Sequence, residues 1–380
     1  MQTVTWSFPT TIVFGPGALA TLGDHVTRIG ATRALVVSDA GVTKAGITLQ
    51  VTKALEAAGI PAASFDDVDP NPVEKNVEEG VVAYREAGAS IVIAVGGGAP
   101  LDTGKLIALK TTHDRPLVDY DDATGGDRFI TSHVPPIITI PTTAGTGSEV
   151  GRSGVVTLAA TGRKTVIFSP HLLAKVAILD PLLTRSLPPR VTAATGFDAL
   201  THCLEAYCSL GDHPMADSIA LGGLELCAEH LVRAVTHGDD LGARGGMMKA
   251  AMMGAVSFQK GLGACHSLAH PLSSEKGLHH GLANALCLPA VVDFNEKVAH
   301  AKLERIRLLL DPTASKAGSC GDALRSLRAR IGLPAGLGAE GVTEADIAKL
   351  ADKAIEDACH RSNPRPVTRD DLAALYRASL

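Results

Sequence analysis

The chain has 380 residues, which is enough for two or three domains of roughly 150 residues with cores that need no disulfide or structural metal. Its 46% hydrophobic and 20% charged residues, with 39 glycines, are typical of a globular protein rich in tight turns and exclude disordered and fibrous architectures. The formal net charge of -5 offers no excess of positive charge to a phosphate backbone, so we expect no nucleic-acid partner.

The cysteines and the distribution of apolar residues indicate the cellular compartment of the protein. The seven cysteines are odd in number and form no C-x-x-C, which predicts neither a disulfide framework nor a zinc ribbon and favours a reducing environment. Residues 1–11 lack a basic segment followed by an apolar one, and no stretch reaches the roughly 20 apolar residues that span a bilayer. We therefore expect a cytoplasmic protein without an export signal or a membrane partner.

The first half alternates short apolar runs with longer amphipathic stretches. Continuous apolar runs are typical of strands buried on both faces, and the alternation predicts β-α-β-α-β with a mostly parallel sheet and right-handed crossovers. A nucleotide site is then expected at the carboxyl ends of the strands. The predicted strands are 34–38, 89–95 and 136–140, and the predicted helices between them are 48–58 and 73–87.

Two glycine-containing loops follow predicted strands. GGGAPLDTGK at 96–105 opens a predicted helix, where backbone amides can approach a pyrophosphate, although an ordinary tight turn explains a glycine triplet equally well. PTTAGTGSE at 141–149 adds hydroxyl groups that can bond phosphate or ribose oxygens. The candidate nucleotide-binding residues in these loops are Gly97, Gly98, Ala99, Asp102, Thr142, Thr143, Thr146 and Ser148.

Asp39 follows the first predicted strand. A carboxylate there can accept hydrogen bonds from an adenosine ribose and repel a 2′-phosphate, which favours NAD over NADP. The alternative is a simple turn or helix N-cap.

The second half shows helical spacing throughout, and Leu187-Pro188-Pro189 is a plausible boundary because consecutive prolines interrupt a helix. We place an α/β dinucleotide-binding domain at 1–185 and an all-helical domain at 186–380. The predicted helices are 192–207, 216–236, 243–256, 303–310, 320–331 and 344–358.

Acidic and histidine residues recur at helical spacing in this half. Asp198 and His202 are four apart, so on a helix they share one face about 6 Å apart along the axis. His266 and His270 repeat that spacing, and His279-His280-Gly281 follows. A carboxylate with several imidazoles suits Fe(II) or Zn(II), whereas single histidines are more often surface or hydrogen-bonded core residues. We expect the neighbouring Cys265 to be a small core residue.

With these motifs the chain resembles the iron-containing (group III) alcohol dehydrogenase family, over residues 14 to about 295. The resemblance implies a dinucleotide-binding α/β domain with a parallel sheet and an all-α metal-binding domain, an architecture shared with dehydroquinate synthase. It implies that His280 is a ligand in preference to His279, because the family ligand directly precedes a glycine. His270 would be a catalytic, non-ligand histidine. The four implied metal ligands are Asp198, His202, His266 and His280.

The resemblance also places NAD(H), preferred over NADP(H), beside Asp39 and the two loops. Asn71, in DPNP at 69–72, resembles the family's nucleotide-side loop, and Lys164 is a candidate ribose contact. Ala99 stands where the family usually has serine, so backbone amides would make that phosphate contact. Residues 150–153 depart from the commoner family sequence, which leaves the substrate class open, and no motif matches beyond Asn295.

The expected function is hydride transfer between an alcohol and an aldehyde or ketone, with Fe(II) expected and Zn(II) the alternative. A homodimer acting on a small-molecule substrate is expected from the family. A zinc enzyme resembling glycerol dehydrogenase and a lyase of the dehydroquinate synthase type are the competing hypotheses. A non-catalytic binding module is a third, and it would leave a complete redox constellation without a purpose.

Overall fold

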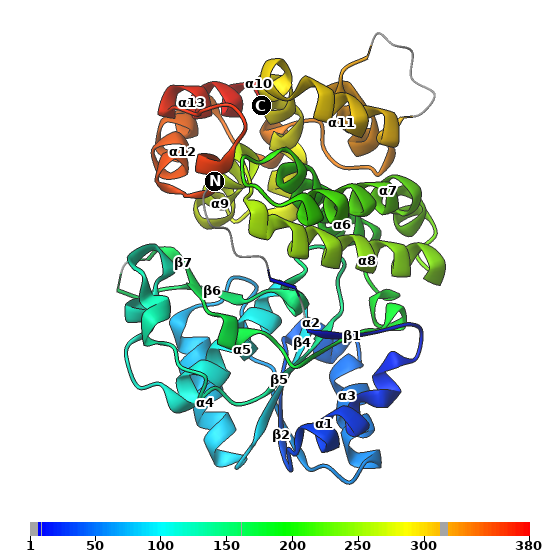
Figure 1. The fold of residues 1–380 in the computed structure, drawn as a ribbon, viewed down its shortest axis with the longest axis vertical. Helices are drawn as coiled ribbons and strands as arrows, with labels where there is room; N and C mark the ends of the chain where they lie inside the picture. The colour runs from blue at the N-terminus through cyan, green and yellow to red at the C-terminus, as the bar shows by residue number, and fades with distance from the viewer. Residues whose placement is uncertain (1–6, 9, 161, 312–317) are drawn as a thin grey trace. The chain divides into compact units, whose positions relative to one another are not determined.

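The structure is a computed structural model that describes residues 7–8, 10–160, 162–311 and 318–380 (Figure 1). It divides into an α/β unit, Phe8–Thr143 with Gly147–Ser186, and a helical unit that contains Ser7, Ala144–Thr146 and Leu187–Leu380. We expected residues 144–146 to belong with the first domain. They pack with the helical unit because Gly145 lies against α6 (Pro189–Cys208), where a Cβ atom would come within 2.8 Å of Thr195.

The α/β unit is built on a six-stranded sheet in the order β1-β8-β5-β4-β2-β3, and every neighbouring pair is parallel. This confirms the predicted fold class. The order reverses between β2 and β4, since the chain passes from β2 out to β3 and then returns to the other side of β2. The strands are β1 (Thr11–Phe14), β2 (Ala34–Val37), β3 (Ala62–Phe65), β4 (Ile91–Gly96), β5 (Ile137–Pro141) and β8 (Val176–Leu179).

Helices cover both faces of this sheet, with α4 and α5 on one side and α1 and α3 on the other (Figure 1). The strand residues alternate accordingly: Val92 belongs to the cluster that contains α4 and α5, whereas Ile91 and Ile93 belong to the other. This two-sided burial explains the continuous apolar runs. The helices are α1 (Leu22–Ile29), α2 (Ala40–Lys44), α3 (Ile47–Ala57), α4 (Glu74–Glu86) and α5 (Gly98–Thr112).

Five further strands in the described part of the chain were absent from the sequence prediction. β1 and β3 are partly exposed edge strands, and β6 (Ser153–Thr157) pairs with β7 (Lys164–Phe168) as an antiparallel hairpin outside the main sheet. β8 is fully buried but only four residues long. Short or half-exposed strands give little periodic signal, so only their pairing partners define them.

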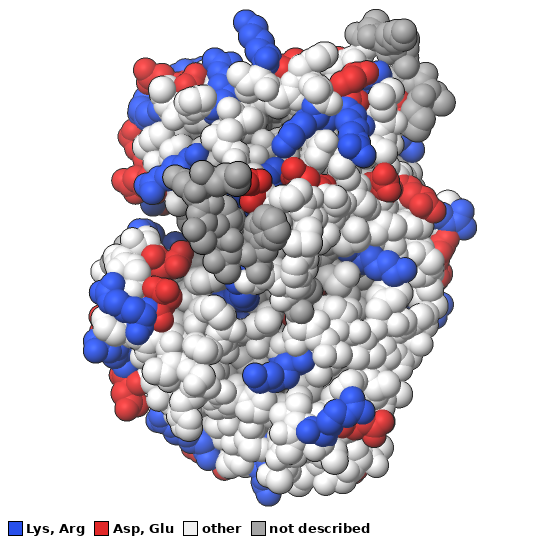
Figure 2. Space-filling model, in the orientation of Figure 1, with Lys and Arg blue, Asp and Glu red and all other residues white. Residues whose placement is uncertain are grey.

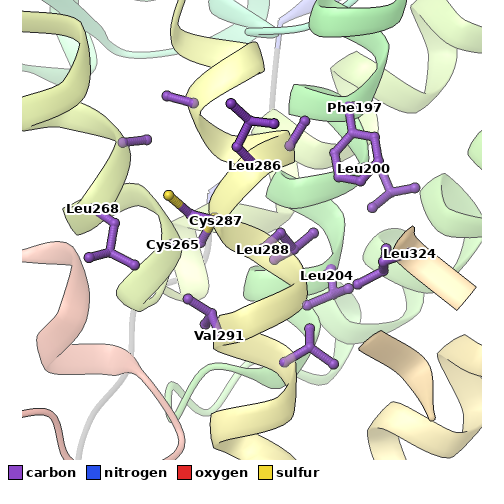
Figure 3. Close-up of a cluster of buried hydrophobic side chains, with 14 of the residues drawn as sticks. Phe197, Leu200, Leu204, Cys265, Leu268, Leu286, Cys287, Leu288, Val291 and Leu324 are labelled. Carbon is purple, nitrogen blue, oxygen red and sulfur yellow. The ribbon is translucent and has the colours of Figure 1, made fainter. Parts of the chain in front are cut away.

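The helical unit is arranged around α6, which is buried from Thr192 to Cys208. A helix buried on all sides is typical of the centre of a bundle. Figure 3 shows side chains of α6, α9, α10 and α11 gathered in its core. Besides α6, the helices are α7 (Pro214–Thr236), α8 (Leu241–Ser257), α9 (Ala264–Lys276), α10 (His280–Leu310), α11 (Cys320–Arg330), α12 (Glu344–Glu356) and α13 (Arg369–Ala378).

The longest helix differs from the prediction. We expected a helix only at 303–310, but α10 begins at His280, contains Pro289 and bends at Ala299, where φ is -119°. Proline and asparagine normally interrupt helices, and here the buried packing of α10 overrides that local preference.

Three observations concern the cysteines, possible membrane-spanning helices and the surface charge. All seven cysteines are free, and Cys265 is a buried core residue as predicted. No helix in the described part of the chain combines the length and apolar character needed to cross a bilayer. On the face shown in Figure 2, acidic and basic side chains are interspersed.

Candidate functional site

Two of the predicted metal ligands lie on α6. Asp198 and His202 are buried, at 2% and 5% exposure, on the same face of the helix. The ring of His202 stacks on that of His266 from α9, with centroids 4.7 Å apart and planes 21° apart. The packing of α6 against its neighbours therefore brings residues 64 positions apart into contact.

Glu205, also on α6, fixes the orientation of His266. Its Oε2 lies 2.5 Å from Nδ1 of His266, and its Oε1 accepts the backbone amide of Cys265 at 2.7 Å. Because an ionised carboxylate only accepts hydrogen bonds, this contact places the proton of the neutral His266 imidazole on Nδ1 and its lone pair on Nε2. This carboxylate–histidine arrangement is typical of imidazoles that bind metals.

Electron-pair donors from three helices converge on one point, which the side-chain nitrogen of Asn284 marks. This nitrogen lies 2.8 Å from Oδ1 of Asp198, 3.2 Å from Nε2 of His280 and 3.4 Å from Nε2 of His266. Ligand atoms of Asp198, His202 and His266 all lie within 4.8 Å of one another, and Nε2 of His280 is 3.7 Å from Oδ1 of Asp198. The structure thus brings together the four ligands that the resemblance implied.

The electrostatics of these residues suit a cation. Burial lowers the pKa of His202 to about 4, so its imidazole is neutral at physiological pH and can bind a metal. Burial also acts to lower the pKa of His266, but the hydrogen bond and charge of Glu205 raise it above its usual value. A set of one carboxylate and three imidazoles without thiolate fits a first-row divalent ion.

The close packing of α10 on α6 explains why the residue after His280 is the glycine Gly281. A Cβ atom there would lie 2.2 Å from the backbone oxygen of Ala194 and 3.0 Å from Cβ of Asp198. The missing side chain therefore allows α10 to approach α6 at the level of the ligands.

The remaining predicted catalytic residue is His270 on α9. Its ring stacks on that of His280, with centroids 5.2 Å apart, and lies 6.0 Å from that of His266. Its Nδ1 is 2.7 Å from Oδ2 of Asp357, and its side chain is 33% exposed. His270 is thus beside the ligands and partly accessible to solvent.

The two glycine-containing loops begin at adjacent strand ends of the α/β unit. Gly96 of β4 pairs with Pro141 of β5, and the amide of Thr142 donates to the carbonyl of Gly96 at 2.9 Å. A Cβ atom on Gly97 would be 3.5 Å from the side chain of Thr143. Gly97 is the N-cap of α5 and no side chain caps this helix, so its first amides suit an anion.

Three other candidate nucleotide-binding residues, Asp102, Ser148 and Asp39, form hydrogen bonds within the protein. Asp102 accepts the hydroxyl of Ser148 at 2.5 Å through Oδ1 and the amide of Val155 at 3.2 Å through Oδ2. Asp39 is the N-cap of α2, where Oδ1 accepts the amide of Val42 at 2.9 Å. The N-cap alternative therefore describes Asp39 in this structure, and a ribose contact would be an additional role.

Five candidates remain. Gly98 is the first residue of α5. Ala99 is in the first turn of α5, Asn71 is an exposed turn residue, and Lys164 is the first residue of β7. Thr146 belongs to the helical unit.

Comparison with known proteins identifies the family. The model of the iron-containing alcohol dehydrogenases matches residues 9–181, and that of the C-terminal domain of the same family matches residues 192–380. The chain belongs to the iron-containing alcohol dehydrogenase family. It is therefore an oxidoreductase of the class that interconverts alcohols and aldehydes in a metal-dependent reaction.

Individual members are similar over their whole length. The 4-hydroxybutyrate dehydrogenase of Cupriavidus necator is 41% identical, with 96% of each chain covered. The crystal structure of a 1,3-propanediol oxidoreductase has a TM-score of 0.95 at 36% identity and full coverage of both chains. The sulfoacetaldehyde reductase of Bifidobacterium kashiwanohense, in complex with NAD+, has a TM-score of 0.90 at 30% identity, covering 100% of this chain and 99% of that one.

The comparisons correct one expectation, because the family match continues to residue 380 and does not end near Asn295. The sequence reasoning also missed Glu205, Asn284 and Asp357. Glu205 lies three positions after His202 and Asn284 four after His280, so helical spacing could have indicated both. Asp357 has no such local signal.

Proposed function

We propose that this member of the family is an NAD(H)-linked alcohol dehydrogenase in which Asp198, His202, His266 and His280 hold one divalent cation. The observation that supports this most strongly is the convergence of Asp198, His266 and His280 on one buried point, with His266 anchored by Glu205. Fe(II) is proposed over Zn(II) because the family is named for iron. The donor types suit both ions.

When bound, such a cation supplies a Lewis acid that lowers the pKa of an alcohol hydroxyl. The protein holds the ligands in place: Glu205 keeps the proton of His266 on Nδ1, and the contact of Gly281 with α6 sets the position of His280. We propose His270 as the catalytic residue, with Nε2 accepting the hydroxyl proton and returning it in the reverse reaction. The overall reaction is alcohol plus NAD+ to aldehyde, NADH and a proton.

The proposed dinucleotide site is the carboxyl edge of the sheet at β2, β4 and β5. Ligands of open α/β sheets bind where the strand order reverses, which here lies between β2 and β4. The first amides of α5 would bind the pyrophosphate beside Thr142 and Thr143. Asp39 would accept a ribose hydroxyl and disfavour a 2′-phosphate.

For the substrate we propose a primary alcohol and its aldehyde. The first pair to assay is 4-hydroxybutyrate and 4-oxobutanoate, because the relative from Cupriavidus necator has that name. The test is anaerobic NADH oxidation by metal-stripped protein, with and without added Fe(II) or Zn(II), on 4-oxobutanoate, 3-hydroxypropanal and acetaldehyde. Metal-dependent turnover is expected.

No NADH oxidation with any aldehyde, despite measured binding of NADH and metal, would overturn this proposal. A lyase of the dehydroquinate synthase type regenerates its NAD within each turnover. It would therefore produce no net change in NADH, and the same assay distinguishes the two activities.

We also propose that residues 1–185, apart from the segment 144–146 that packs with the helical unit, form the dinucleotide-binding domain and residues 186–380 the metal-binding domain of a cytoplasmic homodimer. Light scattering at several protein concentrations tests the dimer. Metal binding by a separately expressed 186–380 segment, checked first for folding by circular dichroism, tests the division of functions.

A further inference from the structure

A carboxylate from a distant part of the helical unit binds His270. Asp357 directly follows α12, 87 positions after His270, and its Oδ2 is 2.7 Å from Nδ1 of that histidine. Its other oxygen, Oδ1, accepts the hydroxyl of Ser267 at 2.7 Å and the amide of Cys359 at 2.8 Å. Both carboxylate oxygens therefore have defined partners.

The segment after Asp357 is fastened to the start of α9, the helix of His270. The amide of His360 donates to Oγ of Ser267 at 2.8 Å, and Oδ1 of Asn363 accepts the amide of Ala264 at 3.3 Å. Asn363 also exchanges two side-chain hydrogen bonds, of 2.8 and 3.0 Å, with Asn295 of α10. These buried and partly buried contacts fix the position of Asp357 along α9.

The Asp357 carboxyl is ionised at neutral pH. Burial acts to raise its pKa, but the hydrogen bond and charge of His270, with the Cys359 amide and the Ser267 hydroxyl, hold the pKa well below its usual range. An ionised carboxylate has no proton to donate, so its contact requires the proton of the neutral imidazole to be on Nδ1. The lone pair is then on Nε2.

We propose that Asp357 is a positioning residue for His270: it holds the ring in one orientation and in the Nδ1–H form, so that Nε2 accepts the substrate proton. This inference rests on the proposed function, in which His270 moves that proton. The stacking of His270 on His280 shows that the orientation so fixed is beside the proposed ligands. Asp357 acts on the reaction only through His270.

A second metal site is the competing interpretation, because ligand atoms of His270, Asp357 and Cys359 lie within 4.8 Å of one another. The hydrogen bonds favour positioning, since Nδ1 of His270 and both oxygens of Asp357 are already paired. Metal analysis separates the two. Binding of a second equivalent of Zn(II) by the wild type, lost in D357N, would overturn the proposal.

The kinetic test is a double-mutant cycle with the metal-loaded full-length enzyme: wild type, D357N, H270A and the double variant. In D357N the amide oxygen would satisfy Ser267 and Cys359, which turns the NH2 group toward His270 and opposes the Nδ1–H form. We expect kcat to fall about 10- to 100-fold with KM unchanged, which is at or below the lower end of general acid–base contributions because His270 itself is still present. The double variant should be no slower than H270A, because Asp357 has no other route to the reaction. If the losses of kcat in D357N and H270A multiply in the double variant, the proposal is overturned.

A spectroscopic readout keeps the test independent of turnover. Nitrogen-15 NMR of labelled histidine, with H270A for assignment, should show the proton of His270 on Nδ1 in the wild type and its loss from Nδ1 in D357N. An unchanged Nδ1–H form in D357N would overturn the proposal even if no aldehyde is reduced, whereas failure of the proposed function appears only as absent turnover. D370N, at an aspartate whose side chain is 94% exposed on α13, is the control for loss of one negative charge.

Discussion

The addition of one methyl group at Gly281 tests the construction of the metal site. A Cβ atom at this position would lie 2.2 Å from the oxygen and 2.8 Å from the carbon of the Ala194 carbonyl. Ordinary carbon contacts are about 3.5 to 4.0 Å, so α10 and α6 have to separate by about 1 Å. A backbone carbonyl in a buried helix cannot rotate away. We expect G281A to lower the free energy of unfolding by about 1–3 kcal/mol, the usual cost of overpacking.

The larger effect is expected on the metal and on turnover. Metal sites tolerate deviations of about 0.2 Å, and a 1 Å misplacement of catalytic groups costs about 100-fold. We therefore predict that G281A weakens metal affinity and lowers kcat by about 100-fold each, equivalent to about 2.8 kcal/mol.

The assay is competition for Zn(II) against a chromogenic chelator, followed by NADH oxidation at saturating metal. G318A is the matched control, because a Cβ atom on Gly318 would meet no atom within 4 Å. Wild-type metal affinity in a folded G281A protein would refute the argument that close approach of α10 to α6 sets the ligand geometry.

Three further predictions follow from individual side chains. E205Q should weaken metal affinity about 10- to 100-fold. The side-chain amide oxygen of the glutamine would accept the backbone amide of Cys265, and its NH2 group would then face Nδ1 of His266. Unchanged affinity in a metal titration would contradict this prediction. D39G should raise the kcat/KM for NADPH relative to NADH by about tenfold through loss of one repulsive charge, and an unchanged ratio would show that Asp39 acts only as an N-cap. Burial raises the pKa of Glu149 from 4.5 to about 7, so the native chain keeps a proton that the unfolded chain has lost, and the free energy of unfolding falls as pH rises from 4.5 to about 7. Urea unfolding at several pH values in this range should show a flatter dependence in E149Q, and an equal slope in both proteins would oppose this assignment.

Much of the architecture could be predicted because it depends on short-range patterns. Apolar runs between amphipathic stretches indicated a parallel sheet with helices on both faces, and the structure has β2, β4 and β5 within one to two residues of the predicted ends. The edge strands and the β6–β7 hairpin could not be predicted in this way. Their short segments become strands through pairing and burial, which depend on the rest of the fold.

The same distinction applies to the candidate site. Asp198 with His202, and His266 with His270, were found because helical spacing places each pair on one face. Their roles stay predictions, but the convergence of their side chains is a property of how α6, α9 and α10 pack. The choice of His280 over His279 came from a family resemblance, and the structure adds the physical reason that Gly281 allows the close approach of α10.

Asp357 shows the limit of local patterns most clearly. No spacing rule connects it to His270, which lies 87 positions earlier, and only the docking of the segment after α12 onto α9 brings them together. The order of residues along the chain determined most of the helices, the buried central strands and the chemical types available for a metal and a dinucleotide, because these depend on neighbours within a few positions. The packing of buried helices decided which carboxylate orients which imidazole, because hydrogen bonds form only between groups that long-range contacts hold within about 3 Å.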